Sequence, residues 1–71
     1  MVSDMSAESR IGASLAALRN DAGLTPEQLA QLSQTPVATV VGIERGVIEP
    51  PAALVARLTA AIAASLQEQR E

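Results

Sequence analysis

The chain has 71 residues with a formal net charge of −3, and it contains no cysteine, histidine or aromatic residue. This composition excludes disulfides and metal sites built on thiolate or imidazole ligands, and the length suits one domain, expected over residues 1–71. The core must use Leu, Ile, Val, Met and Ala, and burial in so small a domain contributes only about 3–5 kcal/mol of stability.

A first helix is expected over residues 6–22. Ser6 is suited to cap it, and the short polar segment 1–6 is expected to fray. Four apolar residues recur at helical spacing and predict one buried stripe: Ile11, Leu15, Leu18 and Ala22. Gly23 follows in the position where glycine commonly ends a helix. The N-terminus lacks the basic start and apolar run of a signal peptide, so none is predicted.

The stretch LTPEQLAQL carries the clearest local signal and predicts a helix over residues 25–32. Its start has the pattern of a capping box with proline in the first turn, formed by Thr25, Pro26 and Gln28. Leu29 and Leu32 are the expected buried residues. The SQTP sequence that follows indicates a turn, after which Pro36 can open the next helix.

The stretch 36–44 is open to two interpretations. Five of its nine residues are β-branched, and four positions would line one face of a strand: Val37, Thr39, Val41 and Ile43. As a helix, the stretch directs Pro36, Val40 and Ile43 inward and directs Val37, Ala38, Val41 and Gly42 outward. A lone strand between helices would leave its backbone groups unpaired, and no second strand candidate exists. We therefore predict a helix over 36–45, ended by Gly46.

A long helix is expected over residues 51–67, after the VIEPP loop. Its apolar residues span an arc of about 120° and are Leu54, Val55, Leu58, Ile62 and Leu66. Four alanines lie opposite, as a surface for close helix contact or as helix-forming filler: Ala53, Ala56, Ala60 and Ala64. Residues 68–71 are expected to fray. The most apolar part, 52–66, contains Arg57 and is too short to span a bilayer, which predicts a cytoplasmic protein without membrane contact.

This order of helices, together with several short motifs, carries a family resemblance. Residues 8–66 resemble the helix-turn-helix domain of the lambda-repressor and Cro family, also called Xre-type. The matching motifs are LR at 18–19, GLT at 23–25, LA at 29–30 and IERG at 43–46. The resemblance implies an all-α bundle of four to five helices. The last helix has no internal glycine and is expected to be longer than is usual in the family.

The resemblance implies that the third helix lies in the major groove of duplex DNA. The residues that it assigns to contact with DNA, or with a protein partner on the same surface, are Thr35, Val37, Ala38, Thr39, Val41, Gly42 and Arg45. Base reading needs side chains with hydrogen-bond donors or acceptors, and the outward valine, alanine and glycine residues have none. Phosphate contacts are also few, because Pro26 lacks an N–H group and Glu27 repels phosphate. The candidate contacts with the DNA backbone that remain are Arg45, Thr35, Gln34 and Arg10.

Three charged residues near helix ends have two readings each. The resemblance implies that Arg19 and Glu44 form an ion pair between the first and third helices; the alternative is two separately solvated charges. Arg45 is either a phosphate contact or a cation placed favourably at a helix C-terminus.

Two classes of function remain open. No enzyme and no cofactor are expected, because the chain lacks a catalytic cysteine or histidine and a glycine-rich phosphate loop. The first class is an Xre-type transcriptional regulator that binds duplex DNA weakly or as a homodimer, since readout of DNA shape needs few base contacts. The second is an antirepressor, inhibitory partner or dimerising adaptor, which would use an apolar surface made by the third helix with Val47 and Ile48. The alternative for that surface is a rotated helix whose valines belong to the core.

Overall fold

The computed structural model describes the backbone of residues 3–69 and the side chains of residues 10–69. It contains four helices, which are α1 (Ser3–Asp21), α2 (Pro26–Ser33), α3 (Val37–Glu44) and α4 (Ala52–Gln69). The described residues contain no strand, so the prediction of an all-α fold is confirmed, and so is the choice of helix for the stretch 36–44.

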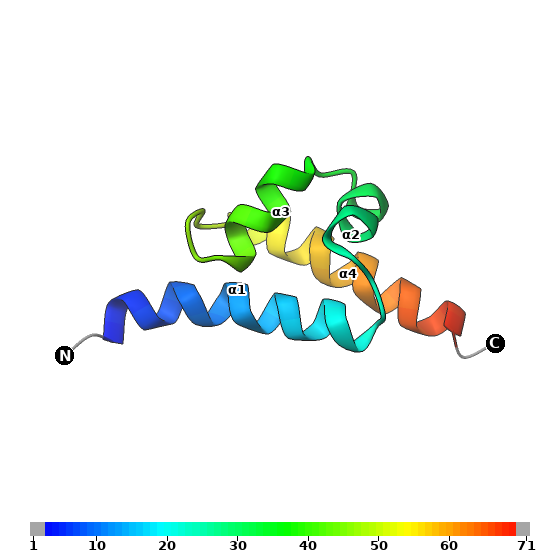
Figure 1. Cartoon of the computed structure of the whole chain (residues 1–71), viewed down its shortest axis with the longest axis horizontal. Helices are drawn as coiled ribbons and strands as arrows, with labels where there is room; N and C mark the ends of the chain where they lie inside the picture. Colours follow the sequence, from blue (N-terminus) through cyan, green and yellow to red (C-terminus); the bar gives the residue numbers. More distant parts are fainter. Residues whose placement is uncertain (1–2, 70–71) are drawn as a thin grey trace.

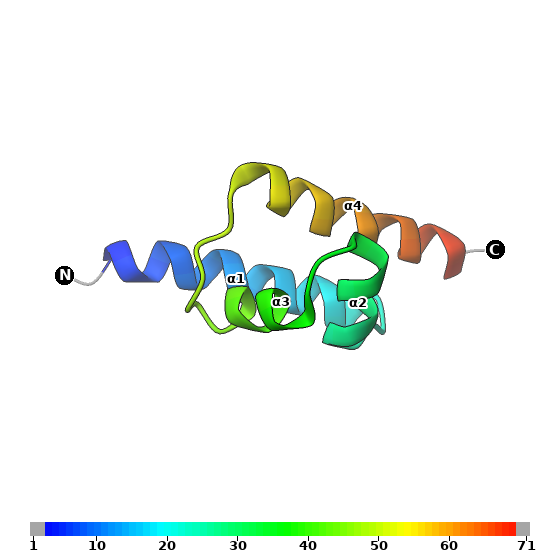
Figure 2. The same cartoon turned by 90° about the horizontal axis from the view of Figure 1, so that it is seen from above.

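The two long helices form the base of the molecule, and the two short helices lie on one side of it (Figure 1). Helix α3 packs against α1, α2 packs against α4, and α2 and α3 contact each other. Seen from above, α1 and α4 diverge toward the start of α4, where the loop from α3 leads into α4 (Figure 2). The short helices therefore bridge two long helices that contact each other little.

The helix boundaries differ from the predicted ones mainly at the ends of the chain. Helix α1 begins at Ser3, so Ser6 lies inside the helix and does not cap it. Residues 3–6, expected to fray, are helical, and α4 continues to Gln69. The remaining parts of the two predicted tails, 1–2 and 70–71, lie outside the described residues.

The start of α2 is fixed by the predicted capping box. The Gln28 amide donates to the Thr25 hydroxyl at 3.0 Å, and the Thr25 amide donates to Gln28 Oε1 at 2.8 Å. Pro26 occupies the first turn, where no amide partner is needed. Two of the N–H groups at this helix end are therefore already bonded within the protein, and a third is absent.

The core is a single cluster that draws on all four helices. Its hydrophobic members are Leu15, Ala22, Leu29, Ala30, Val40, Ile43, Leu58 and Ile62. Val40 and Ile43 are each only 1% exposed, which explains why α3 is helical despite its β-branched residues. The spacing of three brings both side chains to one helix face, whereas a strand would turn them to opposite faces.

The buried stripe of α1 is rotated from the predicted one. Leu15 and Ala22 are buried, but Ile11 and Leu18 are exposed on the flank that faces α4. The rotation follows from α3, which approaches α1 on the side of Gly12, because Gly12 is buried against the α3 backbone. Two further leucines predicted to be buried, Leu32 and Leu66, are exposed at 55% and 37%.

Gly12 permits a close approach between the backbones of α1 and α3. A Cβ atom at this position would overlap the carbonyl oxygen of Ile43 and would lie 3.1 Å from its carbonyl carbon. The Glu44 carbonyl oxygen would be 3.2 Å away. Backbone atoms cannot rotate aside as a side chain can, so α3 can pack here only against glycine.

We expect Gly12→Ala to destabilise the fold by about 1–3 kcal/mol, because the added methyl group overpacks the α1–α3 contact. Thermal unfolding followed by circular dichroism measures the loss. Gly42→Ala is the matched control, because its Cβ would meet the side chain of Ile48, which can move. The gain in helix propensity offsets that contact, so Gly42→Ala should stay within about 0.5 kcal/mol of wild type. Equal losses in the two variants would contradict this account of Gly12.

Candidate nucleic-acid interface

The C-terminal end of α3 is fixed to α1 by a bidentate ion pair. Arg19 Nε lies 2.8 Å from Glu44 Oε2, and Arg19 Nη2 lies 3.0 Å from Glu44 Oε1. The two side chains are only 11% and 12% exposed. The pair expected between the first and third helices is therefore present, and the two charges are mostly shielded from water.

Arg19 also holds the turn between α1 and α2. Its Nη1 donates to the Leu24 carbonyl at 2.7 Å and to Asn20 Oδ1 at 3.3 Å. One guanidinium thus joins the end of α1, the following turn and the end of α3. This use of all three guanidinium nitrogens requires the planar fork of arginine, which a lysine could not reproduce.

At the other end of α3, the turn from α2 is a buried polar network. Ser33 and Thr35 are 5% and 7% exposed. The Ser33 hydroxyl donates to the Leu29 carbonyl at 2.7 Å and lies 3.1 Å from Thr35 Oγ1. Gln34 between them adopts a left-handed backbone conformation with φ of 57°. Thr35, a predicted contact residue, is therefore buried and hydrogen-bonded inside the turn.

Arg57 of α4 completes this network. Its Nε donates to the Ser33 carbonyl at 3.3 Å, and its Nη2 donates to the Gln34 carbonyl at 3.1 Å and to Thr35 Oγ1 at 3.4 Å. The carbonyls at a helix C-terminus lack partners within the helix and carry partial negative charge. Arg57 therefore supplies both the donors and the charge that this end of α2 needs.

The outward surface of α3 is apolar at its start and partly covered farther along. Val37 and Ala38 are exposed, whereas Thr39, Val41 and Gly42 are half-buried. The side chain of Ile48 folds back over Gly42. The predicted apolar surface thus divides into the exposed start of α3 and the loop residue Val47, which is 77% exposed.

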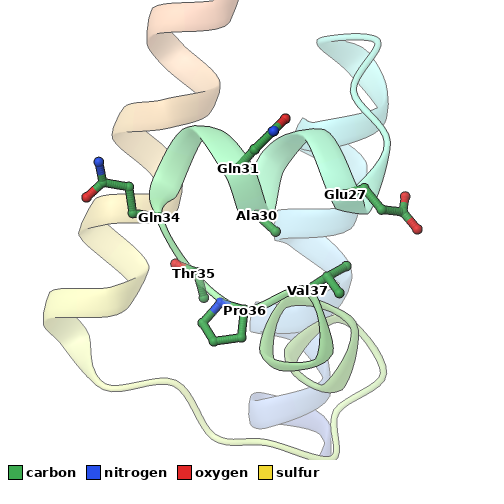
Figure 3. Close-up of a pocket in the computed structure, with 7 residues that line it drawn as sticks. All are labelled: Glu27, Ala30, Gln31, Gln34, Thr35, Pro36 and Val37. Carbon is green, nitrogen blue, oxygen red and sulfur yellow. The ribbon is translucent and has the colours of Figure 1, made fainter.

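A groove runs between α2 and the start of α3, next to the exposed residues. Its lining comes from both helices and their turn: Glu27, Ala30, Gln31, Gln34, Thr35, Pro36 and Val37. Glu27, Gln31 and Gln34 project outward from α2 and its end (Figure 3). No side chain caps α3 at Pro36, and the Val37 and Ala38 amides have no acceptor among the described residues. The start of α3 therefore offers backbone donors where its side chains offer none.

The cations outside this groove are sparse. Arg45 is exposed beside the C-terminal end of α3 and forms no ion pair with any residue of the described part. Arg10 lies on the opposite flank, where it lines an apolar groove between α1 and α4 together with Ile11, Ser14, Leu15, Leu18, Val55 and Thr59. Of the arginines described, Arg45 is the one that lies next to α3 and forms no ion pair or side-chain hydrogen bond with another described residue.

Sequence reasoning identified Arg19, Glu44 and Arg45 but missed Arg57 and Gln31. A lone arginine in an otherwise apolar helix was a usable signal for Arg57, because a charge there needs a partner. No sequence signal distinguished Gln31 from the other polar residues of α2. Within the described residues, no acidic cluster could hold a metal ion, and no helix is long and apolar enough to cross a bilayer.

The geometry of two short helices joined by a tight turn, braced by two longer helices, agrees with the comparison to known families. The chain belongs to the helix-turn-helix domain family, whose profile matches residues 10–71. No curated protein and no solved structure matches the chain. Helix-turn-helix domains are in general DNA-binding modules of regulators, in which the second helix of the motif enters the major groove.

Removing either partner of the Arg19–Glu44 pair should destabilise the domain by about 3–5 kcal/mol, because the other charge is left buried without its partner. We expect Arg19→Ala to cost more than Glu44→Ala, since Arg19 also bonds the Leu24 carbonyl. Urea unfolding followed by circular dichroism, with a stabilising osmolyte present so that the variants remain folded without urea, measures both losses. Arg10→Ala removes an exposed arginine from the same helix and should change stability by less than about 0.5 kcal/mol. A Glu44→Ala variant as stable as wild type would show that the pair contributes nothing.

Proposed function

We propose that this protein is an Xre-type transcriptional regulator that binds duplex DNA through α3, weakly as a monomer and more tightly as a homodimer. The observation that carries the proposal is the exposed and uncapped start of α3, presented by a braced helix-turn-helix unit. In this motif the N-terminal residues of the second helix meet the edges of the bases. The family membership supports the same assignment.

The proposed contacts combine few cations with backbone donors. The Val37 and Ala38 amides and the outward amide side chains of Gln31 and Gln34 can donate to phosphate or base oxygens. Arg45 supplies the positive charge next to α3. Val37 and Ala38 can touch thymine methyl groups but cannot make the bidentate contacts that distinguish base pairs. Binding should therefore depend on DNA shape more than on base sequence.

Salt dependence measures how many phosphates are neutralised. We expect the slope of log affinity against log salt to lie between about −1 and −2, because one or two cations of a monomer face the DNA. Fluorescence anisotropy with a labelled random duplex, at several salt concentrations and below the concentration of any dimerisation, gives the slope. A much steeper slope would mean that the arginines are placed differently on DNA.

Arg45→Ala should lower the affinity for duplex DNA at least about tenfold, since it removes the main cation beside α3. Arg45→Lys should keep most of the affinity, because a phosphate contact can be made by a point charge. Arg10→Ala is the matched control, because it removes the same charge from the side of α1 that faces α4, away from Arg45. Unchanged binding by Arg45→Ala would remove Arg45 from the interface.

A second candidate function is a protein-interaction module that uses the same face. It is favoured by the exposed apolar residues Val37, Val47 and Ile48, which lie on and after α3. Contiguous exposed apolar surface usually marks a contact site, and two of these residues, Val47 and Ile48, are neighbours in the loop after α3. If α3 forms a dimer or binds a protein partner through this face, it cannot also lie in a DNA groove, so the two functions compete for one surface.

Light scattering of aspartate variants separates the two candidates. If the α3 face mediates self-association, Val41→Asp and the more exposed Val47→Asp should both convert a dimer to a monomer, because a charge is costly to bury in an apolar contact. Ala60→Asp places the same charge on the exposed alanine face of α4 and serves as the control. A wild type that stays monomeric at high micromolar concentration removes the self-association form of this candidate. A dimer split only by Ala60→Asp would place the contact on α4.

A further inference from the structure

Helix α3 is held at both ends by arginines that come from the two long helices. At its C-terminal end, Arg19 of α1 binds Glu44. At its N-terminal end, Arg57 of α4 binds the turn that leads into the helix. We propose that Arg57 is a positioning residue for DNA recognition, which sets the direction of α3 by holding this turn; the proposal rests on the DNA-binding function proposed above.

The turn needs such support because of its backbone conformation. Gln34 is the one residue other than glycine with positive φ among those described. A residue with a Cβ atom adopts this conformation only when its surroundings hold it there. The Arg57 guanidinium donates to the two backbone carbonyls that flank the Cα atom of Gln34, which are those of Ser33 and of Gln34 itself. Arg57 thus acts directly on the strained position.

Other bonds at the start of α3 are few. Pro36 provides no side-chain cap, and the Thr35 amide donates to the Ala30 carbonyl at 2.9 Å, which ties the turn to α2 only. Among the described side chains, the hydrogen bonds between this turn and α4 are those of Arg57. Loss of Arg57 would therefore leave the turn before α3 hydrogen-bonded to α2 but no longer hydrogen-bonded to α4.

The position of α3 matters unusually for recognition in this chain. Its outward side chains cannot correct a small displacement by rotating to new hydrogen-bond partners, because Val37 and Ala38 have no polar side-chain atoms. The Val37 and Ala38 amides move with the helix itself. Affinity for DNA should thus depend on how firmly the turn is held, even though the Nε and Nη2 groups of Arg57 face the protein.

Hydrogen exchange and DNA binding, measured on the same variants, test this role. In Arg57→Ala, the amides of Gln34 and Thr35, which donate to Gln31 and Ala30, should exchange about tenfold faster, while the amides of α1 keep their protection. Affinity for the random duplex should fall about tenfold, with the salt slope unchanged, because no phosphate contact is lost. Arg10→Ala removes the same charge and is the control. It should leave the exchange of the turn amides unchanged and should change the affinity for DNA by less than about threefold.

Arg57→Lys is the second variant, for use if Arg57→Ala does not fold. It keeps the charge but loses the planar fork that reaches the Ser33 and Gln34 carbonyls together, so it should accelerate the same amides and weaken DNA binding without changing the salt slope. Unchanged exchange in the turn would overturn the proposal, and so would a salt slope shallower by about 0.9, which would make Arg57 a direct phosphate contact. If the wild type does not bind DNA, the proposed function fails and with it the role in recognition, while the exchange data still decide whether Arg57 holds the turn.

Discussion

The structure depends on the attachment of α3 to α1. This attachment has two parts. The α3 backbone packs against Gly12 of α1, and Arg19, farther along α1, forms an ion pair with Glu44 of α3. The first requires the absence of a side chain, and the second requires two partly buried charges in fixed geometry. Together they set where α3 lies, and therefore which α1 residues are buried and which surface of α3 faces water.

The way this scaffold uses its charged residues limits how many cations are left to contact DNA in the proposed function. The chain has few cations for a DNA-binding protein, and Arg19 and Arg57 are committed to bonds within the protein. The charge of Glu44 is neutralised in the same way, but Glu27 remains beside the α2–α3 groove. In the proposed function, affinity for DNA would then rely on Arg45, on backbone donors and on correct placement of α3, rather than on many neutralised phosphates.

Two open apolar surfaces show where the small core ends. Ile11 and Leu18 of α1 line a groove toward Val55 of α4, and Val47 projects from the loop after α3. A domain of this size buries too little surface to cover every apolar residue. The helices are therefore packed tightly at α3 and loosely between α1 and α4, as their divergence in Figure 2 shows.

Local sequence signals determined the turns and the inner helix ends, but not the outer ends of α1 and α4 or the choice of helix for 36–44. The capping box at Thr25 and Gln28 and the glycines with positive φ at 23 and 46 act through neighbouring residues, so the sequence by itself located the turns. The resemblance to a known family was needed to pair Arg19 with Glu44, which lie 25 positions apart. Only the tertiary structure decided the rotation of α1, the exposure of Ile11, Leu18 and Leu32, the burial of Thr35 and the partners of Arg57. These depend on which helix approaches which face, and that is set by contacts between residues distant in sequence, which helical periodicity alone does not encode.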